Sequence, residues 1–201
     1  MTILALLLLL LLSIFGVGTG NTEGTSEEQT CVAEVGGSER CSPATTNGEY
    51  QLPSSGTVVH ALVNNGPLPP EYQEGYEITI DAAGRATVVV TAPGASDDLG
   101  DQRTLDPIRT TVDLGIDGLQ QLLRDLDNAG FFFLRTRDEI DPADIPIGGD
   151  VSNLEVTLAD RSWDVEGAGL QSDDRVRLDE AQRVLAVAVG LDPAAPVGSS
   201  E

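Results

Sequence analysis

The stretch YEITIDAAGRATVVVTA, which runs from Tyr76 to Ala92, decides the fold. Apolar residues recur at every second position on both sides of a short DAAG turn (Asp81–Gly84): Tyr76, Ile78, Ile80, Ala86, Val88 and Val90. Such alternation is typical of strands with one buried face, and two such runs around a glycine-containing turn predict a β-hairpin. An antiparallel sheet is therefore the expected framework.

Similar runs lie on both sides of this hairpin. Residues 57–64 (TVVHALVN) and 108–115 (IRTTVDLG) each predict a single strand. Residues 152–169 (SNLEVTLADRSWDVEGAG) alternate, turn at ADRS and resume at Trp163 and Val165, which predicts a second hairpin. Together these runs supply five or six strands.

Two segments carry the spacing of amphipathic helices. After Asp117, a candidate N-cap, the segment GLQQLLRDLDNAG places four leucines on one helical face and ends at Gly130: Leu119, Leu122, Leu123 and Leu126. The second segment, DDRVRLDEAQRVLAVAVG, ends at Gly190 and also places its apolar residues on one helical face: Leu178, Ala181, Leu185 and Ala188. The sequence thus predicts an α+β domain over residues 56–190, a mostly antiparallel sheet of five or six strands with two helices on one face.

The N-terminus predicts export. Residues 3–15 (ILALLLLLLLSIF) form an apolar run, and the small residues GVGTG follow it before the first acidic residue, Glu23. This layout is typical of a secretory signal peptide and its cleavage zone. The run is shorter than the roughly 20 residues that span a bilayer as a helix, which favours a signal peptide. The positive charge that usually precedes such a run is missing. Residues 1–20 are therefore expected to be a signal peptide or an N-terminal anchor. Membrane contact is expected only through this segment, if it stays uncleaved.

The segments that flank the domain are polar or rich in proline. Residues 21–55 predict a flexible polar segment with a disulfide loop between Cys31 and Cys41, the only cysteines. A cysteine pair in an exported chain normally forms a disulfide, and Gly36-Gly37 can turn the chain back between the two thiols. Residues 191–201 predict a disordered tail.

The charge balance is strongly acidic. The chain has 33 Asp and Glu against 11 basic residues, all Arg, and a formal net charge of −22. Such a surface repels nucleic acid and anionic lipid, so neither is an expected partner. The acidity fits a high-salt habitat or an arginine-preferring genome, and it also fits the binding of divalent cations.

No catalytic motif stands out. His60 is the only histidine, and alternation places it with Val58 and Leu62 on one side of its strand, where a structural role is expected. A serine nucleophile elbow, a zincin motif and a phosphate-binding glycine loop are absent from the sequence. The chain is therefore expected to be non-enzymatic. A hydrolase that uses paired carboxylates stays open, because so many Asp and Glu are present.

Calcium is the candidate cofactor. Hard cations take six to eight oxygen ligands from loops, and one acidic loop after the phenylalanines concentrates carboxylates: Asp138, Asp141, Asp144 and Asp150. The loop lacks the EF-hand spacing. A calcium-stabilised structural or adhesive domain is one alternative function.

Two stretches are candidate contact surfaces for a protein partner. The loop NNGPLPPEYQEGY combines prolines with Tyr72 and Tyr76. In DNAGFFFL, alternation in a returning strand would send Phe131 and Phe133 to one side and Phe132 to the other. One side is expected in the core, and the other is a candidate contact patch.

The order of these pieces resembles a known group. VVHALVNNGPLPPEYQEGYEITIDAAGRATVVV, then GLQQLLRDLDNAGFFFL, then SNLEVTLADRSWDVEG resembles uncharacterised exported proteins and lipoproteins of actinobacteria and related bacteria, although the lipobox Cys is missing. The Leu-rich helix followed by FF and a sheet is more distantly similar to emfourin, a protein inhibitor of thermolysin-like metallopeptidases. These resemblances imply an exported binding domain at the cell envelope or outside the cell, with an extracytoplasmic protein, such as a peptidase, as its partner.

Overall fold

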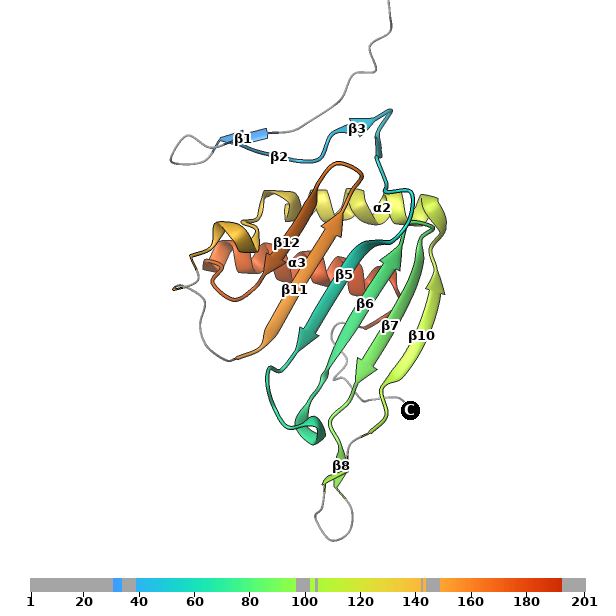
Figure 1. Ribbon diagram of the computed structural model, residues 1–201, viewed down its shortest axis with the longest axis vertical. Coiled ribbons are helices and arrows are strands. Elements are labelled where there is room, and N and C mark those ends of the chain that lie inside the picture. The colour runs from blue at the N-terminus through green and yellow to red at the C-terminus, as the bar shows by residue number, and fades with distance from the viewer. Residues whose placement is uncertain are drawn as a thin grey trace, which may run out of the picture.

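A six-stranded antiparallel sheet forms the centre of the computed structural model, which describes residues 31–33, 39–96, 102–103, 105–141, 143 and 149–192. The strands lie in the order β10-β7-β6-β5-β11-β12 (Figure 1). Their bounds are β5 Thr57–Asn64, β6 Gly75–Asp81, β7 Arg85–Thr91, β10 Ile108–Asp113, β11 Val151–Thr157 and β12 Ser162–Glu166. The α+β class and the antiparallel sheet predicted from the sequence are confirmed.

The central hairpin is the one that the alternation predicted. β6 and β7 pair Tyr76 with Val90 and Ile78 with Val88, so the apolar positions share one face. Asp81 closes the turn, because its Oδ1 accepts the backbone N–H groups of Ala83 and Arg85, each at 2.9 Å. A short side-chain acceptor of this kind is why Asp favours such turns.

Two α-helices of the described chain, α2 (Gly115–Asn128) and α3 (Ser172–Ala188), cover one face of the sheet (Figure 1). The four leucines of α2 are buried, and so are Leu178, Ala181 and Leu185 of α3. α2 begins earlier than predicted: Leu114 occupies the N-cap position, and Asp113 Oδ1 accepts the Gly115 N–H at 3.1 Å. Asp117 lies in the first turn, where its charge favours the positive end of the helix.

The triple phenylalanine corrects the prediction of a returning strand. Gly130 has the left-handed conformation (φ 80°) expected at a helix end, but Phe131–Phe133 then form a single 3₁₀ turn, η2. Side chains in a 3₁₀ turn project about 120° apart, so the two-sided alternation of a strand does not apply. Phe131 and Phe132 both point into the core at 0% and 2% exposure, and Phe133 is half-buried.

Aromatic rings meet around Phe132. Its ring lies 5.3 Å from that of Phe131 and 4.9 Å from that of Trp163, both edge-on, and 6.0 Å from that of Tyr50. Edge-to-face pairs at such distances are favourable. The scarce aromatic residues of the chain therefore join η2, β12 and β4 (Glu49–Tyr50) at one place.

Residues 39–55, which belong to the segment predicted to be flexible, pack on the domain. Tyr50 in β4 (Glu49–Tyr50) is 4% exposed, and it pairs with β3 (Thr45–Thr46) and packs against α2. Its hydroxyl donates to Asp127 Oδ2 at 3.0 Å. One large apolar side chain with satisfied polar groups suffices to hold this otherwise polar stretch on the domain.

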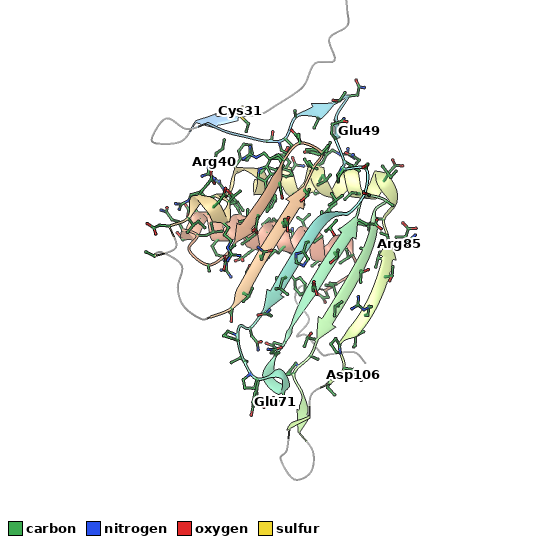
Figure 2. The ribbon with its side chains drawn as sticks, in the orientation of Figure 1. Cys31, Arg40, Glu49, Glu71, Arg85 and Asp106 are labelled. Atoms are coloured by element: carbon green, nitrogen blue, oxygen red, sulfur yellow. A yellow bond between two sulfur atoms is a disulfide. The ribbon has the colours of Figure 1, made fainter. Side chains whose placement is uncertain are left out.

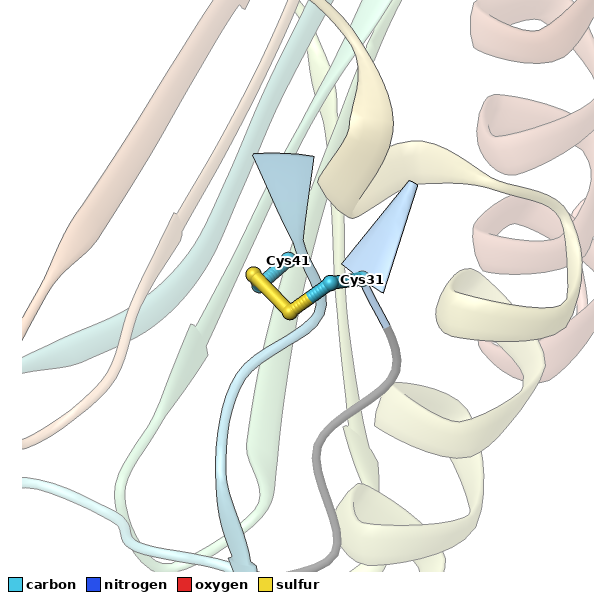
Figure 3. The surroundings of a disulfide bond; sticks show 2 residues. All are labelled: Cys31 and Cys41. Atoms are coloured by element: carbon cyan, nitrogen blue, oxygen red, sulfur yellow. A yellow bond between two sulfur atoms is a disulfide. The ribbon is translucent and has the colours of Figure 1, made fainter. Parts of the chain in front are cut away.

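The predicted disulfide joins Cys31 and Cys41 across a small hairpin, β1 (Cys31–Ala33) and β2 (Glu39–Cys41) (Figure 3). The neighbouring Arg40 anchors β2, because its Nη2 lies 3.2 Å from Glu139 Oε2 and its Nη1 donates to the Phe133 carbonyl at 3.4 Å. The disulfide indicates an oxidising, extracytoplasmic environment.

Short elements complete the fold. They are the 3₁₀ turns η1 (Pro70–Tyr72) and η3 (Arg137–Glu139) and the small hairpin of β8 (Ala95–Ser96) and β9 (Gln102–Arg103). Among the described residues, none of the helices has both the length and the apolarity needed to cross a membrane. The predicted signal segment 1–20 and nearly all of the tail 191–201 lie outside the described residues.

Candidate functional site

The four predicted contact residues do not form one surface. Tyr72 is 47% exposed in η1, whereas Phe131 is fully buried and so cannot belong to a contact surface. Figure 2 shows Glu71 of η1 at one end of the molecule and Arg40, which binds the Phe133 carbonyl, toward the other. Phe131 is therefore a core residue and not a contact residue, because the phenylalanines fold inward at the end of α2.

Tyr76 faces the helix layer and is half-buried against the core. Burial raises the pKa of its hydroxyl, and the nearby charge of Asp179 on α3 raises it further. Tyr76 thus lies in β6 at the boundary between the sheet and α3. Tyr72 remains the accessible member of the predicted tyrosine pair.

The loop around Tyr72 is internally bonded. Asn65 Nδ2 donates to the Tyr72 carbonyl at 2.8 Å, and Asn65 Oδ1 accepts the Glu74 N–H at 3.1 Å. Gln73 Nε2 donates to the Leu68 carbonyl at 2.8 Å. Tyr72 and Leu68 (41% exposed) are therefore presented on a shaped loop, and its role as a contact surface stays a prediction.

The acids of the predicted calcium loop have local partners. Thr136 Oγ1 donates to Asp138 Oδ1 at 2.6 Å, and this bond is the largest cause that lowers the pKa of Asp138. Asp141 Oδ1 accepts the Ala143 N–H at 2.9 Å, and Asp150 is exposed just before β11. Asp144 lies outside the described residues.

These acids do not converge within the part of the chain that the structure describes. No group of three or more His, Cys, Asp or Glu side chains there could hold a metal ion. The calcium site, which included Asp144, stays a prediction. Calorimetry in high salt with and without Ca²⁺ checks it, since a bound cation would raise the melting temperature.

His60 lies on the sheet face that the helices leave uncovered. Its Nε2 lies 3.1 Å from Glu77 Oε1 on β6, and Glu155 of β11 is its cross-strand neighbour on the other side. Val59 and Ala61 point to the core, and Val58, which alternation had placed on the side of His60, is buried as well at a register shift between Thr57 and Val59. The partner of His60 is a carboxylate, which fits the structural role expected from the sequence.

One concave feature of the described surface is a groove between α2 and α3 on the side away from the sheet. Its volume is about 590 Å³. Apolar residues of α3 and the C-cap residue of α2, Ala129, line it; those of α3 are Val176, Val184, Val187 and Ala188. Val176 and Val187 are 67% and 55% exposed, among the highest values for large apolar residues here. We name this feature the α2–α3 groove.

The rim of the α2–α3 groove is charged and organised. Arg183 makes two hydrogen bonds to the Glu180 carboxylate, at 2.6 and 2.7 Å, which raise the pKa of Arg183 and lower that of Glu180. Arg177 Nη1 lies 3.8 Å from Asp174 Oδ1 on the preceding turn. Asp125 contributes an acid from α2. The groove therefore combines an apolar floor with fixed charges of both signs.

The sequence contained a signal for this groove that helical spacing could have found. Val176, Val184 and Val187 stand at i, i+8 and i+11, which places them on one side of α3. This stripe lies roughly 140° around the helix from the buried face of Leu178, Ala181 and Leu185, which helical spacing had already assigned to the core. An apolar stripe beyond the core face is what a second contact would require.

No protein-family model, curated protein or solved structure matches the chain.

Proposed function

We propose that the chain is a secreted or envelope-attached, non-enzymatic binding domain that holds a segment of another extracytoplasmic protein in the α2–α3 groove. The observation that carries the proposal is the exposure of Val176 and Val187 in a groove of about 590 Å³. Helices on a sheet normally turn their apolar residues inward. An exposed apolar stripe in a formed groove is typical of a surface that another chain buries.

The N-terminal segment and the disulfide support the export of the chain. Residues 3–15 have the apolar pattern of a signal peptide, and the Cys31–Cys41 disulfide fits an oxidising compartment. On this basis the protein acts outside the cytoplasm, free or held at the envelope by its N-terminal segment.

The residues that line the groove indicate what kind of partner fits it. A cleft between two helices with small apolar residues suits an amphipathic helix, whose apolar side chains would contact Val176, Val184 and Val187. The net charge of −22 favours a partner surface that carries Lys or Arg, because opposite charges speed association and fix orientation. Because the order of sequence elements led us to expect a peptidase as partner, a thermolysin-like metallopeptidase is the first partner to test.

The test compares three forms of the tagged protein in extracts of envelope and culture supernatant. They are the wild type, Val176→Asp/Val187→Asp in the groove, and Ile116→Asp, a matched control on α2 that is 59% exposed and outside the groove lining. We expect the wild type and the control to retain the same protein and the groove variant to lose it. In parallel, inhibition of thermolysin-like peptidases is measured for the same three forms.

The outcomes separate the parts of the proposal. Loss of the partner in the groove variant alone supports a binding domain at this site. Equal retention by all three forms would contradict the groove, and capture of nothing would contradict the binding function. Binding without inhibition would remove the peptidase-inhibitor reading and leave the binding domain.

A further inference from the structure

One edge of the sheet is open in the described chain. β10 is the terminal strand and pairs only with β7 (Figure 1). Five of its residues are exposed and the sixth, Val112, is half-buried: Ile108, Arg109, Thr110, Thr111 and Asp113 are the exposed ones. A long open edge presents unpaired backbone N–H and C=O groups to any strand that fits them.

The opposite edge is different. η3 lies against β12, and Arg137 Nε lies 3.2 Å from Glu166 Oε2 at the end of that strand. Covering an edge with a neighbouring turn is a common way to prevent further pairing. Of the two sheet edges, β10 is the one that the described chain leaves available.

We infer that β10 pairs with β10 of a second copy of this chain, antiparallel about a two-fold axis, and so joins the two sheets into one. Residues directly opposite in an antiparallel pair lie on the same face, so a symmetric pair must match positions of the same parity. When Thr111 faces Thr111 of the second copy, Arg109 faces Asp113 of that copy, and the reverse pair forms as well. The strand is thus complementary to itself in charge.

The same register satisfies the other face. It places Thr110 opposite Val112 of the second copy, and the paired stretch ends at Asp113, before the N-cap residue Leu114 of α2. A shift that centres Thr110 would instead set Asp113 opposite Pro107, which has no N–H to donate. A shift that centres Val112 would set Asp113 opposite Thr111. Of these three registers, only the one centred on Thr111 matches the opposite charges.

The net charge makes dimer formation depend on the salt concentration. Each copy carries a net charge of −22, so the copies repel at low ionic strength. The Debye length shrinks from about 10 Å at 0.1 M salt to about 3 Å at 1 M, which screens the overall repulsion. Hydrogen bonds between the strand backbones remain. Self-association is therefore expected to strengthen with salt.

The test is sedimentation velocity over a concentration series in low salt and in 1 M NaCl. The wild type is expected to form a dimer in high salt. Thr111→Arg places two like charges face to face at the axis and weakens the dimer at least ten-fold. Thr79→Arg adds the same charge on the same sheet face two strands away, and it should dimerise like the wild type.

Charge reversal and cross-linking test the register. Arg109→Asp should weaken the dimer, and Arg109→Asp/Asp113→Arg should restore it. Because Asp113 also accepts the Gly115 N–H, folding of the double variant is checked by its melting curve. Thr111→Cys faces itself in the proposed register and should form a covalent dimer on oxidation, whereas Thr110→Cys should not, since directly opposed strand residues lie within disulfide range.

Three results would overturn the inference. They are a wild type that stays monomeric in 1 M NaCl, a Thr111→Arg variant that dimerises as well as the wild type, and cross-linking through Thr110→Cys in place of Thr111→Cys. Should the double charge reversal fail to fold, the cysteine pair decides alone.

Discussion

Gln120 on α2 holds the backbone of Tyr50, 70 positions earlier in the chain, with both ends of its side-chain amide. Its Oε1 accepts the Tyr50 N–H and its Nε2 donates to the Tyr50 carbonyl, each at 2.9 Å. Gln120 is 6% exposed and Tyr50 is 4% exposed, so neither backbone group can turn to water. This amide takes the place of a strand partner and fixes the N-terminal segment on the domain.

Removal of that amide should be costly. Gln120→Ala leaves the Tyr50 N–H and C=O buried without partners, and each such group costs about 1–3 kcal/mol. We expect the free energy of unfolding to fall by about 2–4 kcal/mol in urea titrations. Gln121→Ala on the exposed side of the same helix is the control and should change it by less than about 1 kcal/mol. Equal losses would show that Tyr50 is not held in this way.

Asp127 predicts a pH dependence. Burial raises the pKa of this carboxyl, and the hydrogen bond from Tyr50 opposes part of the rise. A folded-state pKa above the unfolded value gives stability that is fully present below the unfolded pKa and is lost as pH rises through the folded pKa. The stability of the wild type relative to Asp127→Asn should therefore fall as pH rises from about 3 toward neutral. Urea unfolding of both proteins over this range measures it, and a flat or rising difference would contradict the buried position of Asp127.

Neighbouring phenylalanines should behave unequally. Phe132 contacts three rings at 2% exposure, whereas Phe133 is half-buried. Phe132→Ala should cost about 3–5 kcal/mol, as for other buried aromatic residues, and Phe133→Ala clearly less. Thermal and urea unfolding compare the two variants. If Phe133 proved the more costly, the inward turn of η2 would be wrong.

The disulfide should stabilise the N-terminal hairpin. Closing a loop of this length contributes about 2–3 kcal/mol at most in the chain-entropy account. The Cys31→Ser/Cys41→Ser double variant should lose no more than that, and hydrogen exchange should increase mainly in residues 39–50. A collapse of the whole domain on reduction would mean that the hairpin contributes to the core.

Local pattern predicted the sheet and the helices because each strand and helix carries its own period. The run Thr57–Asn64 forms β5 with the predicted bounds, and Gly130 and Gly190 end the helices with positive φ values of 80° and 77°. The features that the sequence did not predict depend on contacts between residues far apart in the chain. The partnership of Tyr50 with Gln120 joins distant residues without any periodic signal, and the 3₁₀ turn at Phe131 depends on how α2 meets the sheet.

For the candidate site, too, local spacing predicts one part and only the packing of the helices shows the rest. Helical spacing indicates the stripe of Val176, Val184 and Val187, but only the packing of α3 beside α2 shows that Ala129 completes a groove there. Exposed acids and tyrosines were easy to find in the sequence and are scattered in space. Composition alone therefore favoured the acidic loop over the groove.

Binding of a partner protein in the α2–α3 groove can be tested directly. The most direct measurement is the affinity of the captured protein for the wild type, Val187→Asp and Ile116→Asp, by titration calorimetry. We predict at least a ten-fold weaker affinity for Val187→Asp, equivalent to about 1.4 kcal/mol, and an unchanged affinity for Ile116→Asp. Equal affinities for all three proteins would contradict the account.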